Sequence, residues 1–267
     1  MTVIMRLIAW TAAMLGLTGV AAHAADPKNW QLGLPEPVSP IAVEQVWFHD
    51  VVLMPIITVI TVFVLLLLIY TCWRFSEKRN PNPSRTTHNS VLEVAWTLIP
   101  VLILVFISFP SLRLLYFSDD SSNSEMTLKI TGYQWYWEYS YPDHGDFSFE
   151  AFPVKQDDLK DGQRFLMDTD NQVVVPSDTR IKLIITSADV LHNWAVSEFG
   201  VRSDAVPGRL NEAPLFVPAG KEGVYYGFCS ELCGRDHAYM PIAVKVVSKA
   251  DFAAWQARLG LVKAAAE

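Results

Sequence analysis

The stretch VVLMPIITVITVFVLLLLIYTCW, residues 51–73, has no charged side chain over 23 positions. As a helix rising about 1.5 Å per residue it would be roughly 34 Å long, enough to cross the hydrocarbon core of a membrane. Residues 94–112 form a second uncharged run of 19 positions, within a predicted helix over 94–115. The sequence therefore predicts two transmembrane helices arranged as a hairpin.

The connector between these spans, residues 74–93, indicates how the hairpin is oriented. It contains the turn-rich stretch Asn80-Pro81-Asn82-Pro83-Ser84 and four cations, Arg74, Lys78, Arg79 and Arg85. The segment before the first span, residues 25–50, carries only Lys28. Since cytoplasmic loops hold an excess of Lys and Arg, we expect the connector in the cytoplasm and both mature ends outside.

The N-terminus is typical of an export signal. Arg6 precedes an apolar run over residues 7–22, and Ala22-His23-Ala24 places small residues where a signal peptidase requires them. Cleavage after Ala24 would remove residues 1–24 as a signal peptide. The alternative is a third membrane anchor, which the shortness of the run and the following Asp26 disfavour.

The charge balance limits the class of partner. The chain of 267 residues is 51% hydrophobic and 18% charged, with a formal net charge of −7. This composition excludes a disordered tail protein and a nucleic-acid binder. Residues 118–267 hold 14 Lys and Arg against 22 Asp and Glu, a net charge of −8. The acidity thus lies in the outer domain, and a cationic partner is expected there.

The outer domain, residues 118–267, has mainly strand signals. Seven short apolar or alternating runs are separated by Pro, Gly, Asp and Asn, which favours an all-β sandwich or barrel. A C-terminal helix is expected after Ser248, with Phe252, Trp255 and Leu259 on one face and Gly260 at its end. The seven expected strands are 127–141, 147–152, 172–176, 180–186, 193–196, 223–228 and 242–247.

The segment CSELCGRDHAYMP, residues 229–241, gathers soft metal ligands in one loop. It contains Cys229, Cys233, His237 and Met240, and an earlier strand end supplies His192. Thiolate, thioether and imidazole ligands suit copper, and a second cysteine beyond the single one of a mononuclear site allows two metal ions to be bridged. Zinc is the competing metal, and a disulfide between the two cysteines is the plainest alternative in an exported domain.

These residues resemble subunit II of the haem-copper cytochrome c oxidases over nearly the whole mature chain. The resemblance implies a cupredoxin-like sandwich and a binuclear copper centre, CuA. It implies that Cys229 and Cys233 bridge the coppers, that His192 and His237 bind one copper each, and that Met240 is a weak axial ligand. The Glu231 carbonyl would complete the set, while its carboxylate would bind magnesium shared with subunit I. Phe228, Leu232 and Tyr239 could form an apolar shell around the metal.

The resemblance also implies partners and a location. Trp135, in the aromatic run Gly132–Tyr139, would receive electrons from a basic cytochrome c steered by Asp143, Asp146, Asp170 and Asp189, although the family's docking acid is Ser140 here. Glu93 would open a proton path into subunit I, or simply stabilise the helix start through the dipole. The expected location is a bacterial inner membrane, in a complex with subunit I and other subunits. A membrane-anchored copper carrier and an enzyme of the nitrous oxide reductase class are the alternatives.

Overall fold

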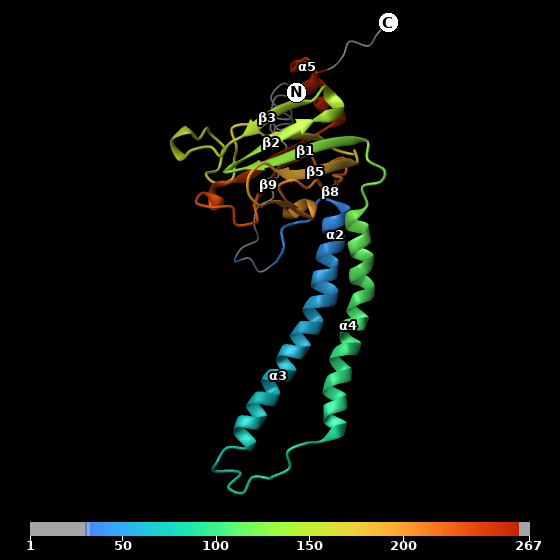
Figure 1. Cartoon of the computed structure of the whole chain (residues 1–267), viewed down its shortest axis with the longest axis vertical. Helices are drawn as coiled ribbons and strands as arrows, with labels where there is room; N and C mark the ends of the chain where they lie inside the picture. Colours follow the sequence, from blue (N-terminus) through green and yellow to red (C-terminus); the bar gives the residue numbers. More distant parts are fainter. Residues whose placement is uncertain (1–29, 31–32, 262–267) are drawn as a thin grey trace, which may run out of the picture.

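Two long helices carry a β-sandwich at one end, in a computed structural model that describes residue 30 and residues 33–261 (Figure 1). The predicted signal peptide, residues 1–24, lies outside the described residues. The first helix runs over Pro40–Arg74 and comprises α2 (Pro40–Trp47), the π-helical segment η2 (Phe48–Leu53) and α3 (Met54–Arg74). The second is α4 (Ser90–Asp119). Both are long and apolar enough to cross a membrane.

Each helix begins at a side-chain cap, several residues before its uncharged run. The Ser39 side chain accepts a hydrogen bond from the Ala42 N–H at 3.0 Å, and Pro40 occupies the first helical position. At α4, Asn89 accepts hydrogen bonds from the Val91 and Leu92 N–H groups. These caps supply partners for N–H groups that the helix itself cannot pair.

The outer domain is a sandwich of two five-stranded sheets. One sheet has the order β3-β2-β1-β5-β8 and the other β4-β10-β9-β6-β7. Their facing side chains, such as Ile130, Trp137 and Trp194, are fully buried and form one core. The strands are β1 (Met126–Tyr133), β2 (Tyr136–Tyr141), β3 (Phe147–Ala151), β4 (Val173–Pro176), β5 (Ile181–Ser187), β6 (His192–Val196), β7 (Val201–Ala205), β8 (Asn211–Leu215), β9 (Gly223–Cys229) and β10 (Pro241–Val247).

The predicted fold class is confirmed, but the strand list needs two corrections. The expected single strand over 127–141 is a hairpin of β1 and β2 that turns at Gln134 and Trp135. The aromatic alternation continues through this turn without Gly, Asn or Asp, so no turn residue marked it. Strands β7 and β8 were missed because their sequences, VRSDA and NEAPL, are polar. They are stabilised by pairing with β6 and β5 rather than by an apolar pattern.

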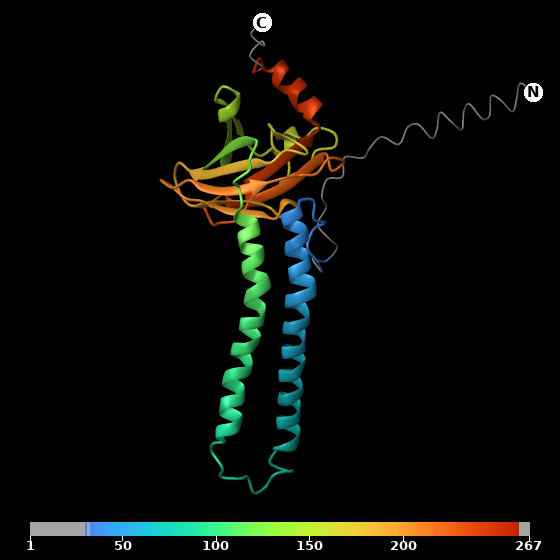
Figure 2. The same ribbon diagram turned by 90° about the vertical axis from the view of Figure 1, so that its right-hand side faces the viewer.

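The predicted C-terminal helix is α5 (Lys249–Arg258), capped by Ser248, whose side chain accepts from the Asp251 N–H. It lies on the side of the sandwich away from the membrane helices (Figure 2). The Trp255 ring packs 5.4 Å from Tyr141 and 6.2 Å from Phe147. The helix thus covers aromatic side chains at the outer edge of the first sheet.

Hydrogen bonds connect the first helix to the sandwich. Ser39 Oγ donates to the Phe199 carbonyl at 2.6 Å, and Gln45 Nε2 donates to the Gly200 carbonyl at 2.9 Å. A Cβ at Gly200 would lie 2.9 Å from the Ala42 nitrogen, so the backbones meet closely here. These contacts fix the sandwich directly above the end of the helix pair.

Candidate metal centre

The β-ladder brings three of the predicted ligands to one end of the second sheet. Cys229 closes β9, His192 opens β6, and Trp194 of β6 pairs with Cys229. The Cys229 N–H donates to the Met240 carbonyl at 3.0 Å, which aligns Met240 beside Cys229 just before β10. Residues that are distant in sequence meet here because one strand ends where its neighbour begins, at the same end of the sheet.

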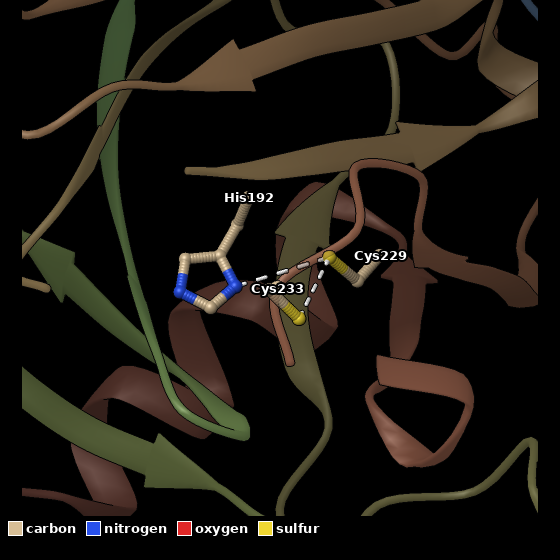
Figure 3. A group of neighbouring side chains, drawn as sticks. All are labelled: His192, Cys229 and Cys233. Carbon is tan, nitrogen blue, oxygen red and sulfur yellow. Dashed lines mark hydrogen bonds between the residues drawn. The ribbon is translucent and has the colours of Figure 1, made fainter. Parts of the chain in front are cut away.

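Each of the two thiols lies close to one imidazole, and Figure 3 shows His192 beside the two cysteines. The Sγ atoms of Cys229 and Cys233 are 3.8 Å apart and both thiols are free. His192 Nδ1 lies 3.9 Å from Cys229 Sγ, and His237 Nδ1 lies 3.5 Å from Cys233 Sγ. Ligand atoms of His192, Cys229 and Cys233 all fall within 4.8 Å of one another. The arrangement is suited to holding metal between the sulfurs.

Met240 and Glu231, whose backbone carbonyls contact Cys229, offer two further candidate donors. Met240 is buried, with 1% of its surface exposed. The backbone carbonyl of Glu231 lies 3.3 Å from Cys229 Sγ, whereas the residue itself is exposed at the surface of the loop. The carbonyl of Glu231 therefore faces Cys229, whereas the residue is exposed at the loop surface.

The surroundings shift the pKa values of the two thiols in opposite directions. Burial alone would raise the pKa of Cys229, but hydrogen bonds with His192 and with the backbone outweigh it and lower the pKa to about 7. Burial, together with the neighbouring Cys229 charge, raises the pKa of Cys233 to about 12. Two adjacent thiolates thus repel each other, and a bound cation is the means of stabilising both.

Asp189 orients His192 from behind. Its Oδ1 lies 2.8 Å from His192 Nε2, while Nδ1 faces the sulfur. Burial alone would lower the pKa of His192, but hydrogen bonds with Cys229 and Asp189 raise it. The ring is fully buried, and a Cβ on Gly132 would lie only 2.9 Å from its Cδ2. A carboxylate behind a ligating imidazole is the usual way to fix its tautomer and direction.

The β1–β2 turn of the first sheet contacts the cysteine loop directly. Gln134 Nε2 donates to the Cys233 carbonyl at 2.7 Å, and Trp135 Nε1 donates to the same oxygen at 3.3 Å. The Gln134 N–H also donates to Asp189 Oδ2 at 2.7 Å. Trp135 is thus hydrogen-bonded to the backbone of a predicted copper ligand.

The predicted steering acids do not form one group around Trp135, as the linear sequence suggested. Asp143 accepts from the Thr127 N–H at 2.6 Å, at the end of β1 opposite the turn, roughly 20 Å away along the strand. Asp146 directly precedes Phe147, which pairs with Tyr141 at that same far end. The hairpin reverses the chain, so closeness in sequence to Trp135 does not mean closeness in space.

Other acids lie nearer to the turn. Asp170 accepts from the Phe152 N–H, and the Phe152 ring stacks on Tyr136 at 4.4 Å. Glu138 and Glu150 face each other across β2 and β3 and were missed by the sequence analysis. Like charges directly opposite on a sheet are destabilising. Side chains of β2 alternate, and Glu138 points outward between two buried aromatic residues. This alternation could have identified Glu138 from the sequence.

The predicted apolar shell around the metal is wrong, because all three side chains lie at the surface. Phe228, Leu232 and Tyr239 are 45%, 76% and 50% exposed. The alternation of β9 turns Phe228 outward where Cys229 points inward, and Leu232 projects from the loop between the cysteines. These side chains form an exposed apolar surface around the site instead of lining it.

Glu93 lies in the first turn of α4, where its Oε1 accepts from the Asn89 N–H at 3.2 Å. This contact supports the helix-start role. Glu93 and the sandwich are separated by most of α4, roughly 39 Å of helix. The Glu93 carboxylate therefore lies at the end of the helix pair that is opposite the cysteine loop.

The chain matches two family models that together follow its architecture. The cytochrome c oxidase subunit II transmembrane domain matches residues 27–114, and the subunit II periplasmic domain matches residues 126–247. A probable cytochrome c oxidase subunit 2 of Rickettsia bellii is 45% identical over 244 residues, 91% of this chain and 90% of the relative. Cytochrome c oxidase subunit 2 of Cereibacter sphaeroides is 44% identical, over 92% of this chain and 89% of the relative.

A solved structure was also found. It is the periplasmic domain of subunit II of cytochrome oxidase (CoxB) of Bradyrhizobium japonicum, 47% identical, covering 52% of this chain and 96% of that one, with a TM-score of 0.47. The two family models, the full-length relatives and the clustered cysteines and histidine agree with the resemblance noted from the sequence. The chain therefore belongs to the cytochrome c oxidase subunit II family and is a subunit of an oxidoreductase.

Proposed function

We propose that the outer domain holds a binuclear copper centre, receives electrons from cytochrome c and passes them to the haem of subunit I. Oxygen reduction there is coupled to proton translocation in this proposal. The observation that carries it is the pairing of each thiol with its own imidazole, at 3.9 Å on one side and 3.5 Å on the other. Two Cys–His pairs with neighbouring sulfurs could serve as the donor set of two metal ions.

The donor chemistry favours two coppers over one zinc. Zinc in a structural site takes four ligands in a closed tetrahedron. Here Met240 and the Glu231 carbonyl stand beside two Cys and two His, which makes six donors. A soft thioether with thiolates and imidazoles is typical of copper. The residues present thus fit the proposed centre.

The chain's contribution is to keep the donors in place. Copper held by Cys229 and Cys233 would supply a one-electron carrier. The β-ladder fixes Cys229 and His192, and Asp189 fixes the imidazole from behind. Burial of His192, Cys229, Cys233 and Met240 limits the access of water to them. A rigid, dry set of ligands limits the rearrangement that accompanies gain or loss of an electron.

The test is a metal count with a spectrum on the purified full chain in detergent. We expect two coppers per chain and a mixed-valence electron paramagnetic resonance pattern with the electron shared equally. Cys233→Ser should lose that pattern. Cys72→Ser is the matched control, because Cys72 lies exposed in α3, and it should keep both coppers. A single copper, or bound zinc without a signal, would overturn the proposal.

We propose the face around Trp135 as the docking site of a basic cytochrome c. Trp135 is half-buried and bonded to Cys233, while Glu138, Glu150 and Asp170 place negative charge nearby. Exposed acids raise the rate of encounter with a cation and are screened over about 8 Å at physiological salt. Glu150→Gln should weaken binding and flatten its salt dependence, whereas Trp135→Gln should leave binding nearly intact and slow electron transfer. Normal transfer in the Trp135 variant would remove it from the path.

We propose that the Glu231 carboxylate binds magnesium shared with subunit I. Support comes from its exposed position on the loop while its carbonyl faces Cys229. Glu231→Gln keeps the carbonyl, so copper should remain while magnesium affinity of the assembled complex falls. Unchanged magnesium or manganese binding would contradict this role.

We propose that Glu93 lies at the cytoplasmic mouth of a proton path into subunit I, with the chain in a bacterial inner membrane and the sandwich in the periplasm. The cations of residues 74–85 support this orientation. Glu93→Gln should slow proton uptake during haem reduction and leave copper reduction unaffected. Normal turnover would leave only the helix-start role, and protease accessibility of the sandwich in inside-out vesicles would contradict the orientation.

A further inference from the structure

The guanidinium of Arg235 lies over the Trp135 ring. Its guanidinium carbon lies 5.1 Å from the centre of the Trp135 ring, within the range of a cation–π contact. The side chain is 80% exposed, so burial does not fix its position. Instead Asp236 holds it: Arg235 Nε lies 3.1 and 3.2 Å from the two carboxylate oxygens, and Nη2 lies 2.9 Å from Oδ2.

The other edge of the Trp135 ring is held by the backbone of the same loop. The indole N–H donates to the Cys233 carbonyl at 3.3 Å. Gly234 makes this approach possible, since its φ is +121° and a Cβ there would lie 3.2 Å from Trp135 Cζ2 and 2.9 Å from Gln134 Nε2. Residues 233–236 therefore wrap the ring from its N–H edge to its face.

We propose that Arg235 is a positioning residue that keeps the Trp135 indole hydrogen-bonded to the Cys233 carbonyl for electron transfer. The inference rests on the proposed function, in which electrons pass through Trp135 to the copper pair. Trp135 packs against the buried core but is itself only half-buried, so part of its ring lies outside the core. The planar guanidinium, anchored by a fork of hydrogen bonds, supplies the missing contact.

A docking charge is the other role open to Arg235, and the geometry disfavours it. A lone cation among Glu138, Glu150 and Asp170 would repel a basic donor. The bidentate pairing with Asp236 cancels that charge locally, so the pair adds little net field. The two roles predict different kinetics. Loss of a repelling charge lowers the KM for the donor, while loss of a positioning contact lowers the limiting rate at saturating donor.

The experiment compares Arg235→Ser and Arg235→Lys in the assembled oxidase, with a basic soluble cytochrome c as donor. We expect Arg235→Ser to lower the limiting transfer rate about two- to fivefold. This is the fall in the population of the hydrogen-bonded indole that loss of an exposed cation–π contact would cause. The copper absorption spectrum and potential should not change. Arg235→Lys should fall between wild type and Arg235→Ser, because it keeps the cation but not the fork. Any other order of rates overturns the proposal.

Two further arms separate the mechanisms. Lys221→Ser removes the same charge at the opposite end of β9, roughly 23 Å from the loop, and should leave the limiting rate unchanged. In a Trp135→Phe background, which lacks the indole N–H, Arg235→Ser should cause no further slowing. Equal slowing in both backgrounds, or a lower KM with an unchanged limiting rate, overturns the inference. A wild-type complex that holds no copper pair, or does not oxidise the donor, refutes the proposed function instead.

Discussion

Glu198 provides a test of the sandwich's electrostatics that does not depend on metal. The residue is 5% exposed and its Oε2 has no hydrogen-bond partner within the described part of the chain. Burial raises the pKa of this carboxyl from 4.5 to about 7. The native state therefore binds the proton more tightly than the unfolded chain, and the free energy of unfolding falls as the pH rises from about 4.5 to about 7. At about 1.4 kcal/mol per pH unit the loss is roughly 3 kcal/mol at most, and it is complete above that range.

Glu198→Gln keeps the side-chain shape and removes the titration. We expect its stability to match wild type near pH 4.5 and to exceed it at pH 8 by up to roughly 3 kcal/mol. The assay is urea unfolding of the full chain in detergent, followed by tryptophan fluorescence across the pH range. Glu212→Gln is the control, with a pH dependence of the opposite sign. Hydrogen bonds with Lys182 and Ser121 lower the pKa of Glu212, so its contribution to stability is present above its ordinary pKa and is lost as the pH falls. Identical pH slopes for wild type and Glu198→Gln between pH 4.5 and 7 would refute the reasoning.

Three predictions concern the metal site. Met240→Leu should retain copper but shift its redox potential in a spectroelectrochemical titration, because a weak axial ligand tunes the metal more than it holds it; complete loss of copper would contradict this role. Asp189→Asn should lower copper affinity about 10- to 100-fold in a competition titration, since the His192 ring loses its carboxylate partner; wild-type affinity would show that the contact is dispensable. Gly132→Ala should lower the free energy of unfolding by about 1–3 kcal/mol, because the new methyl group crowds the His192 ring. Copper content and urea unfolding are the readouts, and wild-type values in both would mean that the ring moves aside freely.

The sequence predicted those features that rest on local pattern and chemistry. Uncharged runs predicted two helices long enough to cross a membrane, and the spacing of residues 229–241 predicted a loop that gathers metal ligands. The helix starts at Pro40 and Ser90 lay outside those runs, because caps and tertiary hydrogen bonds extend a helix beyond its apolar stretch. Strands β7 and β8 could not be found because cross-strand pairing stabilises them rather than apolar alternation.

The surface around Trp135 shows why charge could not be placed from the sequence. Proximity in the chain grouped Asp143 and Asp146 with Trp135, but a turn at residues 134–135 sends them to the far end of the hairpin. Strand register instead brings Glu138 and Glu150 together. Asp189 was expected to be a steering charge, yet its carboxylate also holds His192 and the Gln134 N–H. Which acids face a partner is decided by register and hydrogen bonding, and neither can be seen in a linear pattern.

The proposed ligands divide into those positioned by the sheet and those positioned by the neighbouring turn. Cys229, His192 and Met240 take their places from strand pairing. Cys233 lies in the loop, and its carbonyl is held by Gln134 and Trp135 from the opposite sheet. The turn proposed to receive electrons therefore also positions one of the two thiols. A change at this turn should then alter both the route of the electron and the geometry of the centre. The two effects can be separated only by variants, such as those at Arg235, that leave the Gln134–Cys233 hydrogen bond formed.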